Sequence, residues 1–131
     1  MPSVKLLLVS PDPQSRELMS LAAAGIERRV GEPLEFIEAT DGEAGRGVAL
    51  AERTDVIVAD QTASRAGGFS LARDLRWATE PYPGVIVILL ERRQDGWLAR
   101  WSGADAWFVK PVDPFELADR LLELVTSKER V

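Results

Sequence analysis

Short apolar runs alternate with segments of helical periodicity along the whole chain. Residues 4–9, 55–60, 84–90 and 106–109 are mostly apolar and have the length of strands, with 84–90 the most apolar of them. Such a run is typical of a strand that is covered on both faces. Residues 34–39 partly alternate between apolar and polar side chains, as expected of an edge strand. The pattern therefore predicts five β-strands.

A helix is predicted after each strand. The expected helices cover residues 16–29, 41–51, 69–77, 94–101 and the segment from 114 onward, with Thr40 or Asp41 capping the second and Asp113 the last. In the first helix the apolar face is expected to hold Leu18, Met19, Leu21, Ala22 and Ile26. In the last it is expected to hold Phe115, Ala118, Leu121, Leu122 and Val125, widened by Leu117 and Leu124.

This alternation favours one α/β domain over residues 1–131, with (βα)5 architecture and a doubly wound parallel five-stranded sheet. A common strand order for such a flavodoxin-like fold is 2-1-3-4-5. In open sheets of this kind, ligands bind beyond the carboxyl ends of the strands. The residues at those ends are therefore the candidates for function.

Composition narrows the chemistry. The chain has no cysteine and no histidine, which excludes thiol nucleophiles, Ser-His-Asp triads, histidine-ligated zinc and autophosphorylation on histidine. Its net charge of −5 argues against binding of nucleic acid or of an anionic membrane surface. No apolar run approaches the length of a membrane span, and the N-terminus leads into a strand without a signal peptide, so we expect a soluble cytoplasmic protein.

Polar residues mark the carboxyl ends of four predicted strands. Ser10, Pro11 and Asp12 follow the first strand, and Asp60 ends the third. Glu91 follows the fourth strand and Lys110 follows the fifth. Because parallel strands end at one edge of the sheet, these side chains are expected to share a pocket.

Five segments resemble, in order and spacing, the signature positions of response-regulator receiver domains. They are Val9-Ser10-Pro11-Asp12-Pro13, Val58-Ala59-Asp60, Gly67-Gly68-Phe69, Gly103-Ala104-Asp105 and Val109-Lys110-Pro111-Val112-Asp113-Pro114. The resemblance spans essentially the whole chain. It implies a module of two-component signal transduction (phosphorelay) that is not an enzyme and that interacts with signalling proteins, including a histidine kinase.

The resemblance also implies roles for single residues. Asp60 takes the position of the aspartate that accepts a phosphoryl group, and Lys110 that of the lysine that contacts this group. Trp107 takes the position of the switch aromatic residue. The Thr or Ser that binds a phosphoryl oxygen is replaced by Glu91; if that position falls earlier, on Leu89 or Leu90, the hydroxyl is still missing.

The acid pair that holds Mg²⁺ in this family is replaced by Ser10 and Pro11. Asp12, one residue later, and Asp60 are the remaining candidate ligands, so we expect Mg²⁺ binding to be weak or absent. A carboxylate at Glu91 repels a phosphoryl group, which carries about −1.5 to −2 charges. The loop at 61–67 also lacks the usual apolar residue and proline, so it is expected to be reshaped.

These departures favour an atypical receiver with impaired or absent Mg²⁺-dependent phosphorylation. In the alternative interpretation, Glu91 turns outward, Asp12 serves the metal, and Asp60 is phosphorylated in the conventional way. Simpler structural interpretations exist too: Asp60 forms an ion pair with Lys110, and Glu91 only solvates a loop together with Arg92 and Arg93. A pairing of Glu91 with Lys110 is less favoured.

Two tryptophans suggest a contact surface. Trp97 and Trp101 are four residues apart and therefore share one face of the predicted fourth helix. We expect one of them in the core and at least one exposed, on a surface for a partner or for a homodimer formed by the fourth helix, fifth strand and fifth helix. The chain is expected to act alone, without an effector domain. A ligand-binding or enzymatic flavodoxin-like domain is the less favoured class, because no phosphate-binding glycine motif occurs.

Overall fold

In the computed structural model, which describes residues 4–61 and 67–129, five strands form one parallel sheet in the order β2-β1-β3-β4-β5. The strands are β1 (Lys5–Val9), β2 (Glu35–Ala39), β3 (Val56–Asp60), β4 (Val85–Leu90) and β5 (Ala106–Val109). The predicted fold class and strand order are confirmed. The predicted reshaping of the 61–67 loop concerns mainly residues 62–66, which lie outside the described residues.

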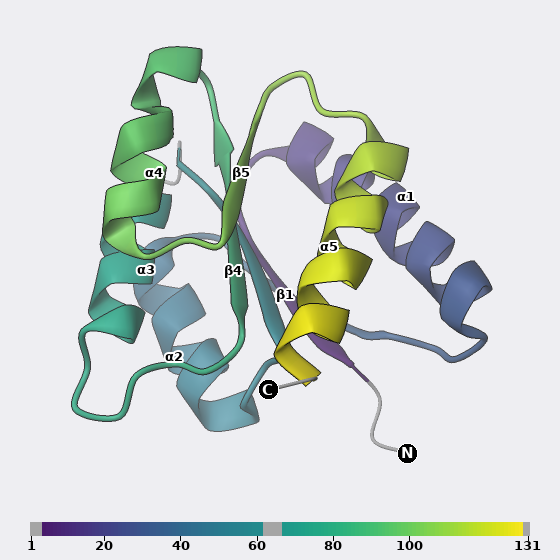
Figure 1. The fold of residues 1–131 in the computed structure, drawn as a ribbon, viewed down its shortest axis with the longest axis horizontal. Coiled ribbons are helices and arrows are strands. Elements are labelled where there is room, and N and C mark those ends of the chain that lie inside the picture. The colour runs from purple at the N-terminus through teal and green to yellow at the C-terminus, as the bar shows by residue number, and fades with distance from the viewer. Residues whose placement is uncertain (1–3, 62–66, 130–131) are drawn as a thin grey trace.

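The helices cover both faces of the sheet (Figure 1). They are α1 (Pro13–Val30), α2 (Gly42–Glu52), α3 (Gly68–Arg76), α4 (Gly96–Ser102) and α5 (Pro114–Glu129), and the 3₁₀ turn η1 (Arg93–Asp95) precedes α4. Helices α1 and α5 pack on one face, while α2, α3 and α4 pack on the other. The described part contains no helix that is both long and apolar enough to cross a membrane.

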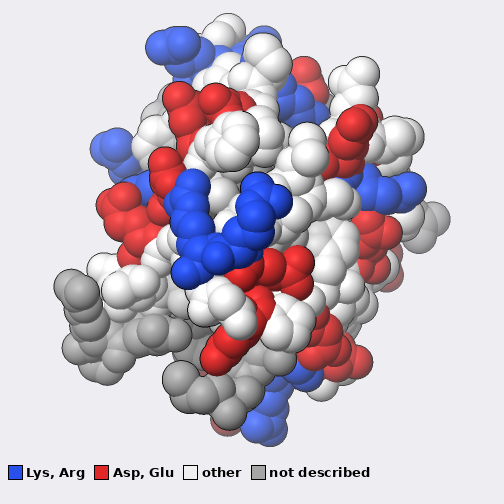
Figure 2. Space-filling model, turned by 90° about the vertical axis from the view of Figure 1, so that its right-hand side faces the viewer, with Lys and Arg blue, Asp and Glu red and all other residues white. Residues whose placement is uncertain are grey.

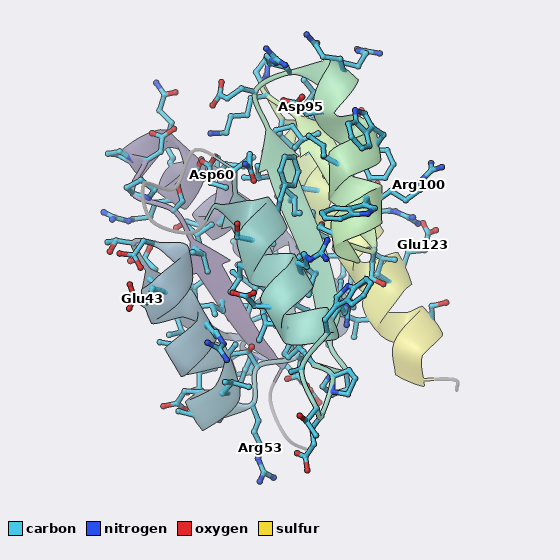
Figure 3. All side chains as sticks on the ribbon, turned by 90° about the vertical axis from the view of Figure 1, so that its left-hand side faces the viewer. Glu43, Arg53, Asp60, Asp95, Arg100 and Glu123 are labelled. Carbon is cyan, nitrogen blue, oxygen red and sulfur yellow. The ribbon has the colours of Figure 1, made fainter. Side chains whose placement is uncertain are left out.

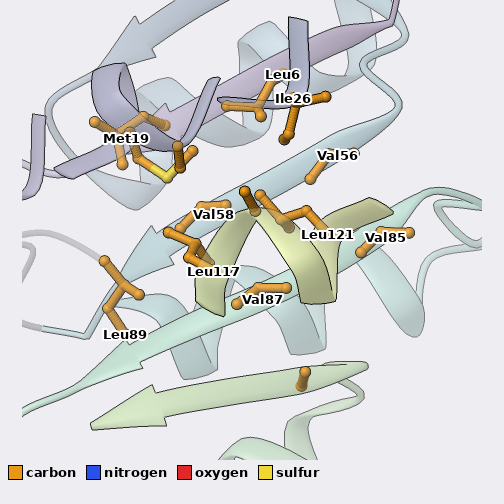
Figure 4. Close-up of a cluster of buried hydrophobic side chains, with 14 residues drawn as sticks. Leu6, Met19, Ile26, Val56, Val58, Val85, Val87, Leu89, Leu117 and Leu121 are labelled. Carbon is orange, nitrogen blue, oxygen red and sulfur yellow. The ribbon is translucent and has the colours of Figure 1, made fainter. Parts of the chain in front are cut away.

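The central strands are apolar because each of their faces is covered by helices. All six side chains of β4 are buried, and they alternate between the two cores. In the core beneath α1 and α5, side chains of the two helices pack onto those of β1, β3 and β4 (Figure 4). This double burial holds the carboxyl ends of β1, β3 and β4 in fixed register.

Aspartate side chains cap the N-termini of α1 and α2, close to the carboxyl ends of the strands. The Asp12 side chain accepts a hydrogen bond from the backbone N–H of Gln14 and thereby caps α1, which starts at Pro13. Asp41, rather than Thr40, caps α2 by accepting from the N–H of Ala44. At its far end α1 stops at Gly31, whose φ of 77° suits a residue without a Cβ.

Two predicted core positions are wrong. Leu21 on α1 and Phe115 on α5 are exposed, although both belong to the apolar stripes of their helices. Each of these helices buries only a narrow stripe on the sheet, formed by Met19, Ala22 and Ile26 on α1 and by Leu117, Ala118 and Leu121 on α5. Leu21 and Phe115 lie at the margins of these stripes, where no second layer covers them.

Candidate functional site

Asp60 is completely buried at the carboxyl end of β3. Its strand lies between β1 and β4, and Asp60 pairs in register with Leu89. Figure 3 labels Asp60, which lies at the carboxyl end of this central strand. A charged carboxylate at such a site requires hydrogen-bond donors around it.

Three side chains donate to the same carboxylate oxygen, Oδ2 of Asp60. The Oγ of Ser10 lies 3.1 Å away, the Oγ of Ser15 2.8 Å, and the Nζ of Lys110 2.6 Å. They come from the end of β1, the first turn of α1 and the end of β5. Asp60 therefore joins four segments of the chain through one oxygen, and the predicted ion pair between Asp60 and Lys110 is present in the structure.

Lys110 is held over the site by its backbone, whose N–H donates to the carbonyl of Leu90. Its Nζ lies 3.2 Å from Oε1 of Glu91 and 3.6 Å from Oδ2 of Asp12, in addition to its contact with Asp60. Burial lowers the pKa of the Lys110 ammonium, but the hydrogen bonds and charges of Asp60 and then Glu91 outweigh burial, so the pKa is raised above its usual value. Lys110 is therefore a firmly protonated cation shared by three carboxylates.

The segment after β1 is ordered by backbone contacts. The N–H of Ser10 donates to the carbonyl of Ala39 at the end of β2, and the Oγ of Ser10 accepts from the N–H of Asp12. Pro11 between them has no N–H and is exposed. The Ser10 hydroxyl is thus fixed by two hydrogen bonds, one accepted from the N–H of Asp12 and one donated to the carboxylate of Asp60. The Oδ1 of Asp12 caps α1.

Glu91 does more than solvate its loop, so that prediction is wrong. Its carboxylate pairs with Lys110, while its side chain keeps 54% of its surface exposed. The sequence suggested that Glu91 lies solvated in its loop together with Arg92 and Arg93, whereas in the structure Arg92 pairs with Asp95. The physical reason is that Lys110 at the end of neighbouring β5 brings its ammonium next to the residue that follows β4. Leu89 and Leu90, the earlier positions considered for the missing hydroxyl, are both buried.

The tryptophans divide into two groups. Trp107 on β5 is partly buried against α4, where a Cβ on Gly96 would come within 2.8 Å of its Nε1. Trp97 and Trp101 on α4 are 67% and 54% exposed. The expected exposure is observed for both, and the prediction that one of them lies in the core is wrong, because α4 turns its buried residues Gly96, Ala99 and Ser102 toward the sheet instead.

Ser15 is the site residue that the sequence analysis missed. It lies one helical turn beyond the segment after β1, and it is buried although it is a polar residue on a helix. A serine within the first turn of a helix is commonly interpreted as a capping residue, so its type gave no separate signal. Among the described residues, no group of three or more carboxylate, histidine or cysteine side chains is arranged to hold a metal ion.

Comparison with known proteins shows which proteins the chain is similar to. Over 73 residues the chain is 36% identical to an uncharacterized response regulatory protein of Mycobacterium tuberculosis, which covers 56% of the chain and 54% of that protein. It is 28% identical to the DNA-binding dual master transcriptional regulator RpaA of Synechocystis, over 97% of the chain and 51% of the regulator. The structure superposes on the chemotaxis response regulator CheY4 of Vibrio cholerae with a TM-score of 0.75 and 25% identity, covering 95% and 99% of the two chains. In sequence and in fold, the chain is similar to response-regulator receiver domains.

A second structural neighbour of the chain is the signal receiver domain of a histidine kinase from Syntrophus aciditrophicus, with a TM-score of 0.81 at 20% identity, over 98% of this chain and 95% of that one. No family model matches the chain. The chain spans about half the length of the curated relatives that it matches.

Proposed function

We propose that this receiver domain is a signalling module that acts in the cytoplasm through contacts with other proteins, and that Mg²⁺-dependent phosphorylation of Asp60 is impaired. The observation that carries the proposal is the state of Asp60. It has no exposed surface, and one of its oxygens already accepts from Ser10, Ser15 and Lys110. To react, the carboxylate would have to give up donors that its burial makes necessary.

The residues present do not fit the magnesium site of the family. Mg²⁺ binds through one or two carboxylates together with water and phosphate oxygens. At the matched positions the chain offers the neutral hydroxyl of Ser10, which already donates to Asp60, and Pro11, which has no side-chain ligand. The carboxylate of Asp12 caps α1 and faces Lys110. A metal would have to displace the lysine from this group of carboxylates.

Electrostatics work in the same direction. The single ammonium of Lys110 already faces the carboxylates of Asp12, Asp60 and Glu91. A phosphoryl group brings about −1.5 to −2 further charges. Each unit of like charge about 4 Å away costs about 4 kcal/mol at an effective dielectric constant near 20. Phosphorylation would therefore require both Glu91 and Asp12 to move away or be neutralised.

One observation favours the conventional function as a second candidate. The Glu91 side chain is half exposed, so it can rotate into solvent and release Lys110 to a phosphoryl group on Asp60. In that case a histidine kinase would be the phosphoryl donor, as the resemblance implies.

The two candidates differ in their response to beryllofluoride with Mg²⁺, which mimics an aspartyl phosphate. We expect the tryptophan fluorescence of the wild-type chain to stay unchanged on titration. A double variant that restores the acid pair, Ser10→Asp with Pro11→Asp, should respond, and the same variant with Asp60→Asn should not. A saturable response of the wild-type chain that is lost on Asp60→Asn would overturn the proposal.

A further inference from the structure

Arginine and tryptophan side chains gather on the outer side of α3 and α4, away from Asp60. Five residues form this Arg–Trp face: Arg73, Trp77, Trp97, Arg100 and Trp101. Trp77, Trp97 and Trp101 are each more than half exposed. Figure 3 shows α3 and α4 side by side, with Arg100 extending from α4. Large exposed aromatic side chains in one place are a mark of contact surfaces.

The arginines on this face are held by aromatic rings. The guanidinium carbon of Arg73 lies 4.8 Å from the ring centroid of Trp77 and 4.1 Å from that of Trp101, so it sits between two rings. The guanidinium of Arg100 lies 5.3 Å from the ring of Trp107. Such stacking fixes the planar group while leaving its charge uncompensated. In the described part of the chain, no ion pair includes Arg73 or Arg100. Only part of the Arg73 guanidinium is open to solvent, because its Nη1 is buried.

On another face of the molecule, charged side chains are paired with one another. On the α1–α5 side, Arg29 pairs with Asp119 and Arg120 with Glu123, and Figure 2 shows blue and red groups in contact over this face. Residues 92–103 carry three arginines and one aspartate, whereas residues 114–129 carry four acidic and two basic residues. The five residues of the Arg–Trp face themselves include two arginines and no acidic residue, so in a chain of net charge −5 the face is locally positive.

We propose that the Arg–Trp face binds an acidic segment of a partner protein, one in which carboxylates alternate with apolar side chains. This inference rests on the proposed function, because it names the partner's chemistry for a module that acts through protein contacts. Carboxylates of the segment pair with Arg73 and Arg100, which present planar donor groups suited to bidentate binding. Apolar side chains of the segment cover the exposed rings of Trp97 and Trp101.

Charge complementarity selects this occupant over a second copy of the chain. A symmetric contact through the Arg–Trp face would place the arginines of one copy near those of the other, since both copies use the same surface. Like charges in close contact oppose association. An acidic segment meets the same arginines with opposite charge.

The test uses a phage-displayed library of short random peptides, panned against the whole chain. We expect enriched peptides to combine aspartate or glutamate with apolar residues. A synthetic peptide of the enriched sequence should then bind in a fluorescence anisotropy assay, and replacement of its acidic residues by amides should abolish binding. Binding should weaken about tenfold or more in Arg73→Ala and in Trp101→Ala, as at a typical interface hot spot.

Two substitutions outside the face serve as controls: Arg46→Ala on α2 and Leu21→Ala on α1, both at exposed positions. Neither should change the affinity, and circular dichroism should show that all four variants are folded. Enriched peptides without acidic residues, binding that the face variants leave intact, or self-association that Trp101→Ala abolishes would each overturn the inference. The beryllofluoride titration is independent of this result, so a failure here leaves the proposed function standing.

Discussion

The hydroxyl of Ser15 donates to the buried carboxylate of Asp60 across 45 positions of sequence, at 2.8 Å. Ser15 belongs to the first turn of α1, so the contact ties the start of this helix to the end of β3. Together with Ser10 it places two neutral donors on an oxygen that also carries the ion pair with Lys110. Asp60 therefore has a structural role in the described pocket that needs no phosphoryl group.

Replacing Ser15 with alanine should destabilise the fold. A hydrogen bond to a charged group contributes about 1.5–3 kcal/mol, and alanine returns about 0.5 kcal/mol through its higher helix propensity. We expect the free energy of unfolding to fall by about 1–2.5 kcal/mol in urea denaturation. Ser20→Ala, at an exposed position of the same helix, is the matched control and should be neutral or slightly stabilising. Equal effects of the two substitutions would show that the Ser15 contact contributes nothing.

Removing the ammonium of Lys110 should lower the free energy of unfolding more than removing the Ser15 hydroxyl does. Lys110→Met removes the ammonium that pairs with the fully buried Asp60, and breaking a buried pair typically costs about 3–5 kcal/mol. Lys5→Met removes a more exposed lysine from its pairs with Glu35 and Glu52, and such pairs contribute about 1 kcal/mol or less. Urea denaturation of both variants at neutral pH measures the difference. A loss for Lys110→Met no larger than that for Lys5→Met would contradict the structural role of the pair.

Alkaline pH should destabilise the protein through Tyr82. Burial, as the largest cause, raises the pKa of this phenol to about 12, and its hydroxyl donates to the carbonyl of Thr54. The phenol loses its proton near pH 10 in the unfolded chain but only near pH 12 in the folded protein. The free energy of unfolding is therefore unaffected by this group below pH 10 and falls as the pH rises from 10 toward 12. The full loss is about 3 kcal/mol at 1.36 kcal/mol per pKa unit.

Tyr82 is the only tyrosine of the chain, so phenolate absorbance reports its titration directly. In the folded protein, the phenolate absorbance should increase only at pH values well above 10. Tyr82→Phe should remove this part of the pH dependence of the free energy of unfolding. A midpoint near 10 in the folded protein would show that the phenol is not buried as described.

Two glycines of α2 should respond oppositely to alanine. A Cβ at Gly45 would lie 2.6 Å from Cγ2 of Val9, the residue that precedes Ser10, whereas one at Gly47 meets nothing within 4 Å. Gly45→Ala should therefore destabilise by about 1–3 kcal/mol through overpacking. Gly47→Ala should stabilise by about 0.5–1 kcal/mol, because alanine favours the helix. The midpoints of thermal unfolding of the two variants measure both effects. Stabilisation by both substitutions would contradict the close packing of α2 on β1.

The fold could be predicted because the spacing of apolar residues along the sequence indicates which side chains are buried. The run at 84–90 and the stripe at Leu117, Ala118 and Leu121 reflect contacts that every helix and strand of this architecture makes. The predicted pairing of Asp60 with Lys110 followed from the shared edge of parallel strands. Ser15 and the pairing of Glu91 with Lys110 depend instead on side-chain direction, which no spacing encodes. The aromatic stacking of Arg73 was missed for the same reason, because it joins two helices at a distance set only by the packed fold.

We expect that this pocket does not hold a phosphoryl group on Asp60. The most direct test incubates the whole chain with Mg²⁺ and a small-molecule phosphodonor and follows the intact mass, with the acid-pair variant (Ser10→Asp, Pro11→Asp) as the positive control. We expect an unmodified mass for the wild-type chain and a gain of one phosphoryl group for the variant. Stoichiometric phosphorylation of the wild-type chain that disappears in Asp60→Asn would contradict it.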